Sequence, residues 1–306
     1  MKYSTANEHY GKGICTIDGG DLRERVSSED VATLLIQTFN SSNYSPPMLP
    51  VVAIELMQIT RNPNTSLKQV SDLIERDPWL TARAIKIARS PAFGMAQINS
   101  IRDAVVRLGV GGIQQCILQA ALQGRIFKLD SHRALMEGLY NHSVLTAQLA
   151  RKISQYTALY EDYAYLCGLL HDIGIVGGLL ALADRQRTLP SLDILARPLH
   201  DAHEVGGGII GAAWDLPPDI LHVISTHHLR TAEKYTHPLS AIICLAEYLA
   251  NTKGPAPAHP YLDHTGILQL KHAREVLRLD DARWAALVRD VDKLLEAMSA
   301  SDGEGA

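Results

Sequence analysis

The sequence predicts an all-α protein built of two helical bundles. Apolar residues recur at helical spacing, proline and glycine separate these segments, and few stretches alternate β-branched residues as a strand would. Histidine distinguishes the two halves, because 12 of the 13 histidines lie between His132 and His272, while residues 10–131 contain none. The boundary between the bundles is therefore expected near Leu129–His132.

Composition limits the class of protein. The 306 residues are 46% hydrophobic and 20% charged, as in a globular protein with a buried core. The formal charge is −4 and no long basic run exists, so no nucleic-acid partner is expected. The N-terminus has no apolar segment, and no uninterrupted run of about 18 apolar residues occurs, so neither a signal peptide nor a membrane partner is expected.

Cysteine usage indicates a reducing compartment. The four cysteines are far apart and form no CxxC pair, which argues against a zinc ribbon or a thioredoxin-like motif. They are Cys15, Cys116, Cys167 and Cys244. The expected localisation is the cytoplasm.

The chain divides into four segments. Residues 1–27 are polar and glycine-rich and are expected to form a flexible arm, and residues 299–306 a disordered tail. Residues 28–130 are expected to form the first bundle, and residues 131–298 the second bundle with further helices at its C-terminal end. In the first bundle, helix starts are predicted from N-cap residues and prolines at Ser28, Leu49, Ser66 and Asp77–Pro78. Gly109 is expected to end a helix that starts near Arg102.

The second bundle places polar residues in apolar surroundings. His142 shares a helical stripe with Leu145 and Leu149, so it is expected to face inward. His171 and Asp172 are the polar residues in the fifteen-residue segment 166–180. A buried carboxylate costs several kcal/mol unless it is paired or bound to metal. One interpretation is that Asp172 caps a backbone turn with His171 as its neutral partner; the other is a metal site.

Three further segments carry similar candidates. His203 precedes a run of small and apolar residues, His227 and His228 end an apolar helix, and Glu247 is the single charge in the apolar segment 239–250. Taken singly, these are core histidines, partners of a helix dipole, or an exposed polar edge. Taken together, a common metal centre would satisfy all of them at once. A scaffold without metal stays open as an alternative.

Motifs in the first region carry a resemblance to a known family. They are Leu49-Pro50, the stretch from Asp77 to Arg83, the stretch from Ser90 to Gly94 and the stretch from Ile98 to Gly109. Their order and spacing resemble the HDOD family, the HD-related output domain of bacterial signalling proteins, over residues 45–250. The resemblance implies an all-α fold, a second bundle like that of the HD superfamily, and a role in bacterial signal transduction.

The order of the polar candidates resembles the metal-site order of the HD-GYP branch. In that branch the residues bind two or three transition metals, commonly iron or manganese, and hydrolyse cyclic di-GMP. The resemblance implies one or two such ions per chain here, with Asp172 as the catalytic residue that bridges them. The implied ligands are His142, His171, Asp172, His203, His227, His228 and Glu247.

The sequence departs from the HD-GYP pattern at positions that bear on chemistry. Ile175 stands where those enzymes carry lysine, and no Gly-Tyr-Pro loop follows His228. Glu247 replaces an aspartate, and Gly138 stands where a glutamate would support a third metal. We therefore expect the ligands to be retained while the hydrolytic groups are reduced.

Three functions fit this pattern. The first is a regulatory module of bacterial signalling that keeps an HD-type site of two metals with weak or no hydrolase activity. The second is a metal-dependent phosphohydrolase or phosphodiesterase that acts on a cyclic dinucleotide or another nucleotide. The third is a di-iron oxygenase, as found elsewhere in the HD superfamily. The expected partners are signalling proteins supplied in trans, or a nucleotide-type ligand.

Overall fold

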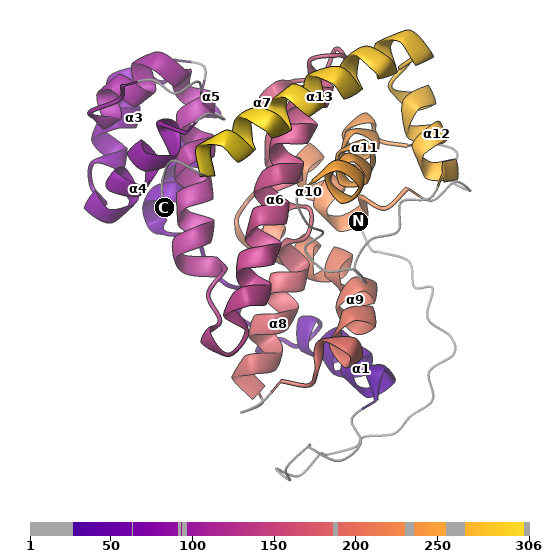
Figure 1. Cartoon of the computed structure of the whole chain (residues 1–306). Coiled ribbons are helices and arrows are strands. Elements are labelled where there is room, and N and C mark those ends of the chain that lie inside the picture. Colours follow the sequence, from indigo (N-terminus) through magenta and orange to yellow (C-terminus); the bar gives the residue numbers. More distant parts are fainter. Residues whose placement is uncertain are drawn as a thin grey trace.

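The computed structural model describes residues 27–62, 64–90, 93, 97–185, 189–229, 236–254 and 267–302. Regular structure in these residues is helical and includes no strand, which confirms the predicted all-α fold. The helices are α1 (Ser28–Phe39), α2 (Val51–Ile59), α3 (Leu67–Ile74), α4 (Pro78–Ala88), α5 (Ile101–Ala121), η2 (Leu122–Ile126), η3 (Asp130–His132), α6 (Arg133–Ser154), α7 (Glu161–Leu170), α8 (Ile173–Arg185), α9 (Leu192–Ala213), α10 (Pro218–Thr226), α11 (Pro238–Lys253), α12 (Ile267–Val276) and α13 (Asp281–Asp302) (Figure 1).

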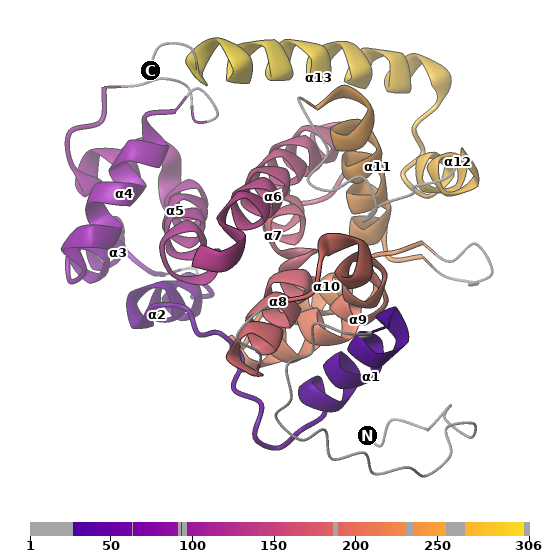
Figure 2. The same cartoon turned by 60° about the horizontal axis from the view of Figure 1, so that its bottom comes forward.

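Helices α2 to α5 form a small bundle at one side of the molecule (Figure 2). Helices α3 and α4 pack on α5, and α2 packs on α3 and α5. The predicted start of α4 is confirmed, because the Asp77 side chain accepts a 2.9 Å hydrogen bond from the Leu80 N–H and Pro78 follows it. Such a cap satisfies a backbone donor that the helix itself leaves open.

Gly109 interrupts α5 as the sequence predicts. Its φ of +70° and ψ of −179° are not helical, so two helical segments meet there at a kink. A positive φ is readily adopted by glycine because it has no Cβ. The second segment continues to Ala121 and then into the short π-helical turn η2.

Helices α6 to α11 form the larger bundle. Helix α6 packs on α7 and α11, α8 packs on α9, and α10 packs on α9 and α7. Helix α12 packs on α11, and α13 contacts α6 as it crosses the top of the molecule (Figures 1 and 2). The C-terminal helices therefore lie against the second bundle.

Helix α1 lies away from the small bundle and packs on α9 and α8 (Figure 2). Leu35 and Phe39 of α1 are buried, and Gly206 of α9 has no side chain where the Phe39 ring approaches. A hydrogen bond holds the segment after α1 against the second bundle: the Trp214 indole N–H donates to the Pro47 carbonyl at 2.9 Å. The described part of the chain thus starts on the second bundle with α1 and crosses to the first, and the division near residue 130 stays a prediction.

The ends of the chain fall partly outside the described residues. Residues 1–26 of the predicted arm and 303–306 of the predicted tail are not described. Helix α13 continues through residues 299–302, which the sequence assigned to the tail. Ser299 extends the helix with a hydrogen bond from its hydroxyl to the Leu295 carbonyl.

Two stretches are long and apolar enough to cross a membrane when judged by length and composition. They are Ile101–Ile126 and Glu161–Arg185. In the fold, 61% of the apolar window of the first and 83% of that of the second are buried inside the protein. Burial in a core accounts for apolar helices of this kind.

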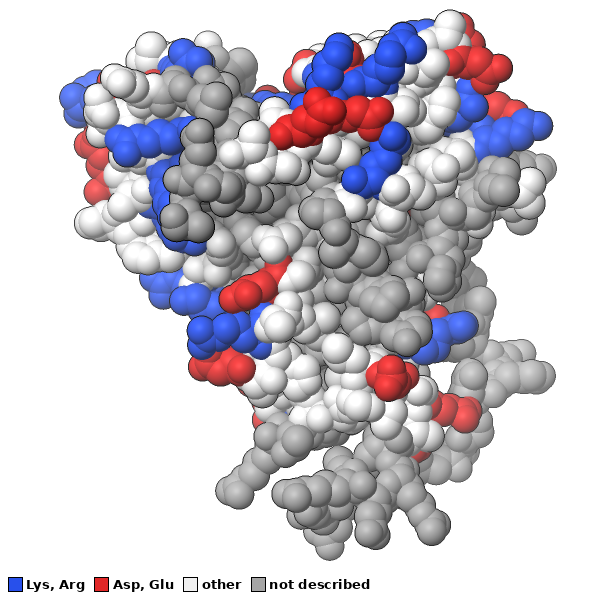
Figure 3. Space-filling view, in the orientation of Figure 1, with Lys and Arg blue, Asp and Glu red and all other residues white. Residues whose placement is uncertain are grey.

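Charged side chains of both signs are interspersed on the face of the molecule drawn in Figure 3. Surface ion pairs such as Lys68–Asp72 and Arg76–Glu55 reflect the same mixture. This distribution agrees with the formal charge of −4.

Candidate metal centre

The seven predicted ligands lie together at the centre of the second bundle. His142 is in the middle of α6, His171 and Asp172 lie between α7 and α8, and His203 is in α9. His227 caps the C-terminal end of α10, His228 follows it, and Glu247 is in α11. Five segments separated by up to about a hundred residues thus converge on one point.

Glycines let the ligand-bearing helices approach closely. A Cβ on Gly168 would meet the backbone of Ala147, and a Cβ on Gly174 would meet the backbone of His203 and Gly207. A Cβ on Gly207 would in turn meet the Ile224 carbonyl of α10. Because these positions have no side chain, α7 packs closely on α6, α8 on α9, and α9 on α10.

Asp172 lies between two groups of histidines. Its Oδ2 atom is 3.1 Å from Nε2 of His171 and 3.9 Å from Nε2 of His142. Its Oδ1 atom is 3.7 Å from Nε2 of His203 and 3.8 Å from Nε2 of His227. Each carboxylate oxygen therefore faces a different group, the arrangement that a carboxylate bridging two ions requires.

Three imidazole nitrogens converge on the Oδ1 side. Nε2 of His203 lies 3.2 Å from Nε2 of His227 and 3.2 Å from Nε2 of His228. Two nitrogens bound about 2.1 Å from one ion, at an angle of about 90° to 110°, are separated by about 3.0 to 3.4 Å. The histidine spacing therefore fits the edges of one coordination polyhedron, with Asp172 on the same side.

Glu247 lies against both groups of histidines. Its Oε1 atom lies 3.3 Å from Nε2 of His171 and 4.0 Å from Nε2 of His227. The substitution of glutamate for the expected aspartate thus still places a carboxylate against the histidines. The candidate ligand atoms of His142, His171 and Asp172 form one close group, those of His203, His227 and His228 a second, and those of Asp172, His227 and Glu247 a third that joins the two.

Backbone hydrogen bonds orient two of the imidazoles. Nδ1 of His171 donates to the Gly168 carbonyl at 2.8 Å, and Nδ1 of His203 donates to the His200 carbonyl. A neutral histidine that donates from Nδ1 carries its lone pair on Nε2, the atom that faces Asp172 in both cases. Hydrogen bonds of this kind are usual behind histidines that bind metal.

Burial sets the electrostatics of the cluster. Desolvation lowers the pKa of His142 and of His203 to about 4, and it lowers that of His227 well below its ordinary value. Burial alone would raise the pKa of Asp172, but the neighbouring His171, His203 and His227 outweigh it and hold that pKa well below its usual range. At neutral pH the cluster therefore contains an ionised Asp172 beside neutral imidazoles at His142, His203 and His227.

This donor set fits transition-metal ions. The Glu247 side chain is 4% exposed and that of Asp172 14% exposed, and no Lys or Arg in the described part of the chain pairs with Asp172. Buried carboxylates need positive charge nearby, which divalent cations would supply. Imidazole nitrogens mixed with carboxylate oxygens suit zinc, iron or manganese rather than calcium.

Sequence inspection missed Thr146 and Glu204 beside the cluster, and it made His200 only a weaker candidate outside the seven predicted ligands. Thr146 is one turn after His142, with its hydroxyl 3.4 Å from Nε2 of that histidine. Glu204 accepts a 3.1 Å hydrogen bond from the His228 N–H, and the His200 ring lies 5.1 Å from that of His228. Helical spacing could have found Thr146, because it is four residues from His142, and it also places His200 one turn before His203.

The structure shows the surroundings of two positions at which the sequence departs from the HD-GYP pattern. Ile175 is 1% exposed and lies in the apolar core, so an aliphatic side chain occupies the position of the lysine. Gly138, one turn before His142 on α6, offers no side chain to a third ion. The residues after Leu229, where the Gly-Tyr-Pro loop would lie, are outside the described residues until Thr236.

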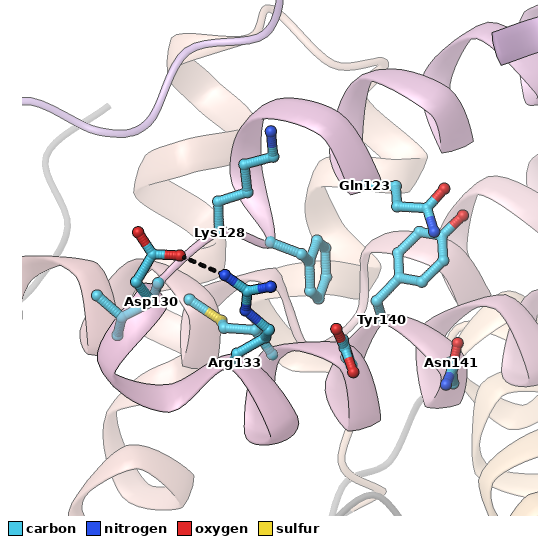
Figure 4. Close-up of a pocket in the computed structure, with 10 residues that line it drawn as sticks. Gln123, Lys128, Asp130, Arg133, Tyr140 and Asn141 are labelled. Carbon is cyan, nitrogen blue, oxygen red and sulfur yellow. Dashed lines mark hydrogen bonds and ion pairs between the residues drawn. The ribbon is translucent and has the colours of Figure 1, made fainter.

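A cavity of about 640 Å³ lies apart from the candidate ligands, where η2 and η3 lead into α6 (Figure 4). Phe127 and Tyr140 pack edge to face in its wall, with ring centres 5.6 Å apart. At its rim Arg133 pairs with Asp130 at 3.0 Å. None of the seven predicted ligands lines this cavity.

Comparison with solved structures shows a similar fold in three bacterial proteins. An HDOD domain protein of unknown function from Geobacter sulfurreducens is 24% identical, with a TM-score of 0.66 over 90% of this chain and 98% of that one. A protein from Shewanella amazonensis SB2B, provisionally named a metal-dependent phosphohydrolase, is 20% identical, with a TM-score of 0.66 over 89% and 99% of the two chains. A protein from Marinobacter aquaeolei VT8, provisionally named a signal transduction protein, is 19% identical, with a TM-score of 0.60 over 89% and 66%.

No curated protein matches the sequence. The family model of the HDOD domain matches residues 47–229, which is more than half of the chain. The match spans the small bundle and four of the five segments that carry the candidate ligands, leaving Glu247 outside. The chain therefore belongs to the HDOD domain family.

Proposed function

We propose that this protein is a regulatory module of bacterial signalling that holds a dinuclear metal centre and has weak or no hydrolase activity. The position of Asp172 carries the proposal, because its two oxygens face two separate sets of histidines. Membership of the HDOD family and the provisional name of the Marinobacter protein support the signalling role.

The ions that this site would hold are iron or manganese, one or two per chain. His142, His171 and Glu247 would hold one ion, and His203, His227 and His228 the other, with Asp172 shared between them. Bound ions would neutralise the buried carboxylates and fix the ends of α7 and α10. The ordering of those helix ends gives the module two states, loaded and empty, that a signalling partner or a nucleotide-type ligand could distinguish.

The reduced hydrolase activity follows from what surrounds the ligands. A hydrolase needs a proton donor for the leaving group and room for the substrate phosphate. Ile175 supplies no proton, and the candidate ligands His171, His203 and His227 are at most 1% exposed. The geometry is suited to holding ions more than to admitting a phosphodiester.

Metal analysis of protein purified without a histidine tag tests the proposal. We expect about two ions per chain in the native protein and a loss in His171→Ala, because this histidine lies 3.1 Å from Asp172. His132→Ala, which changes a histidine at the start of α6, is the matched control and should retain the full metal content. Equal losses in both variants would show that the ions are adventitious and would refute the proposal.

A metal-dependent phosphohydrolase is the second candidate. The shared carboxylate and the provisional name of the Shewanella protein favour it. Loaded protein should be assayed with cyclic dinucleotides, linear dinucleotides and mononucleotides. Turnover that disappears in Asp172→Ala would establish the hydrolase, whereas oxygen consumption by the iron-loaded protein would indicate the di-iron oxygenase instead.

A further inference from the structure

The candidate metal centre is closed to solvent on most sides. The side chains of His171 and His227 have no exposed surface, and those of His203 and Glu247 are at most 4% exposed. An ion must nevertheless reach these nitrogens and leave them. The cluster reaches water only at its edge, where the Asp172 side chain is 14% exposed and His228 is half-buried.

His200 occupies that edge. It lies one turn before His203 on α9, and its side chain is 35% exposed. Its ring centre is 5.5 Å from that of His203 and 5.1 Å from that of His228. Residues three apart on a helix share a face, so His200 is both open to water and adjacent to the inner histidines.

His200 is not one of the inner ligands. The nitrogens of His203, His227 and His228 lie within 4.8 Å of one another, whereas no nitrogen of His200 belongs to such a group. The His200 backbone carbonyl accepts the Nδ1–H of His203, so replacing the His200 side chain leaves that hydrogen bond available. The orientation of His203 therefore depends on the backbone of His200 and not on its imidazole.

Acidic groups surround this edge. The Asp201 carboxylate lies 3.4 Å from Nδ1 of His200, and Glu204 follows one turn later on α9. Arg197 offsets part of this charge through its ion pair with Asp201 at 2.7 Å. The carboxylates still give an approaching cation a favourable path to the imidazole.

Resting on the proposed metal centre, we propose that His200 is an entry ligand for divalent metal ions. It binds the incoming ion through its imidazole and passes it to His228 and His203, without belonging to the final coordination sphere. An entry ligand lowers the kinetic barrier that the metal ion crosses on its way into and out of the site. Loss of this ligand therefore slows metal uptake and metal release by the same factor and leaves the equilibrium affinity for the metal unchanged. An equilibrium ligand would change the affinity instead.

Stopped-flow measurement with Co²⁺ tests this role in the full chain freed of metal. His200→Gln keeps the approximate size of the side chain but removes the ring nitrogens. We expect Co²⁺ uptake and Co²⁺ loss to excess chelator both to slow by about tenfold, which corresponds to a barrier higher by about 1.4 kcal/mol in each direction. The final Co²⁺ content should equal that of the native protein, and His200→Cys, which restores a ligand atom, should recover much of the rate.

His222→Gln is the matched control, because His222 is an exposed histidine of α10. Its rates should equal those of the native protein. Unchanged rates in His200→Gln would overturn the entry role, and a weakened affinity would overturn it by making His200 an equilibrium ligand. A native protein that takes up no Co²⁺ would refute the metal centre itself, an outcome seen before any variant is compared.

Discussion

The Nε2 atoms of His203 and His227 lie 3.2 Å apart, although the two residues come from different helices. Nδ1 of His203 donates to a backbone carbonyl, so its Nε2 presents a lone pair to His227. Without metal, His227 can donate its Nε2–H across this gap. When metal is bound, both Nε2 atoms can face one ion. The Nε2 proton of His227 and the metal ion therefore compete for the space between the two rings.

Asp172→Asn should empty both ion positions. The amide keeps the shape of the side chain but loses the charge that each oxygen presents to its own group of histidines. We expect about two ions per chain in the native protein, close to none in Asp172→Asn, and about one in His228→Ala, because loss of a shared carboxylate affects both ions. Elemental analysis checks the series. Full metal content in Asp172→Asn would contradict a bridging role.

The metal-free protein should lose stability as the pH is lowered from 6.5 to 4. Burial holds the pKa of His142 and His203 at about 4, whereas an unfolded chain titrates near 6.5. In this window the unfolded state binds more protons, so the free energy of unfolding falls as the pH is lowered, by at most about 3.4 kcal/mol for each histidine.

Urea denaturation of the metal-free protein at pH 7 and at pH 5 measures this effect. His142→Gln should reduce the difference between the two pH values, because it removes one buried group whose pKa is lowered. A free energy of unfolding that stays constant between pH 7 and pH 5 would show that the buried histidines do not control stability.

Gly174→Ala should lower both stability and metal content. The added methyl would meet the backbone of His203 and Gly207, and backbone cannot move aside as a side chain can. Overpacking of this kind costs about 1 to 3 kcal/mol and would push α8 away from α9. The melting temperature and the metal content report the two effects.

Gly208→Ala is the control for this substitution. It is on α9 as well, and its new methyl would meet only the Ser225 side chain, at 3.2 Å. Its metal content should stay close to that of the native protein. A Gly174→Ala protein as stable and as fully loaded as Gly208→Ala would contradict the role given to the close contact of α8 and α9.

Glu204→Ala should lower the metal affinity of the group formed by His203, His227 and His228. Glu204 accepts the His228 N–H at 3.1 Å and so fixes the segment after α10. Loss of an orienting group behind a ligand costs about tenfold to a hundredfold in metal affinity. Glu204→Gln keeps an acceptor and should bind metal nearly as tightly as the native protein, as measured by competition with a chelator. Equal affinities in the two variants would argue against this positioning role.

Several helix boundaries could be predicted from the sequence. Asp77–Pro78 and Gly109 act locally, through a capping side chain and a backbone angle that glycine readily adopts, so their roles need no knowledge of the rest of the chain. The bundle against which α1 packs could not be predicted in this way. The apolar face of α1 would suit either bundle, and its contact with α9 depends on the space left at Gly206.

The types of candidate ligand can be predicted from local sequence, because a histidine or carboxylate in an apolar segment is costly unless something pairs with it. The grouping of these ligands depends instead on how the helices pack. That Asp172 separates two sets of histidines, that Glu204 orients His228 and that His200 stands at the solvent edge all depend on where α6 to α11 cross. These crossings are set by backbone contacts at glycines between residues distant in the chain, which a local pattern of side chains does not encode.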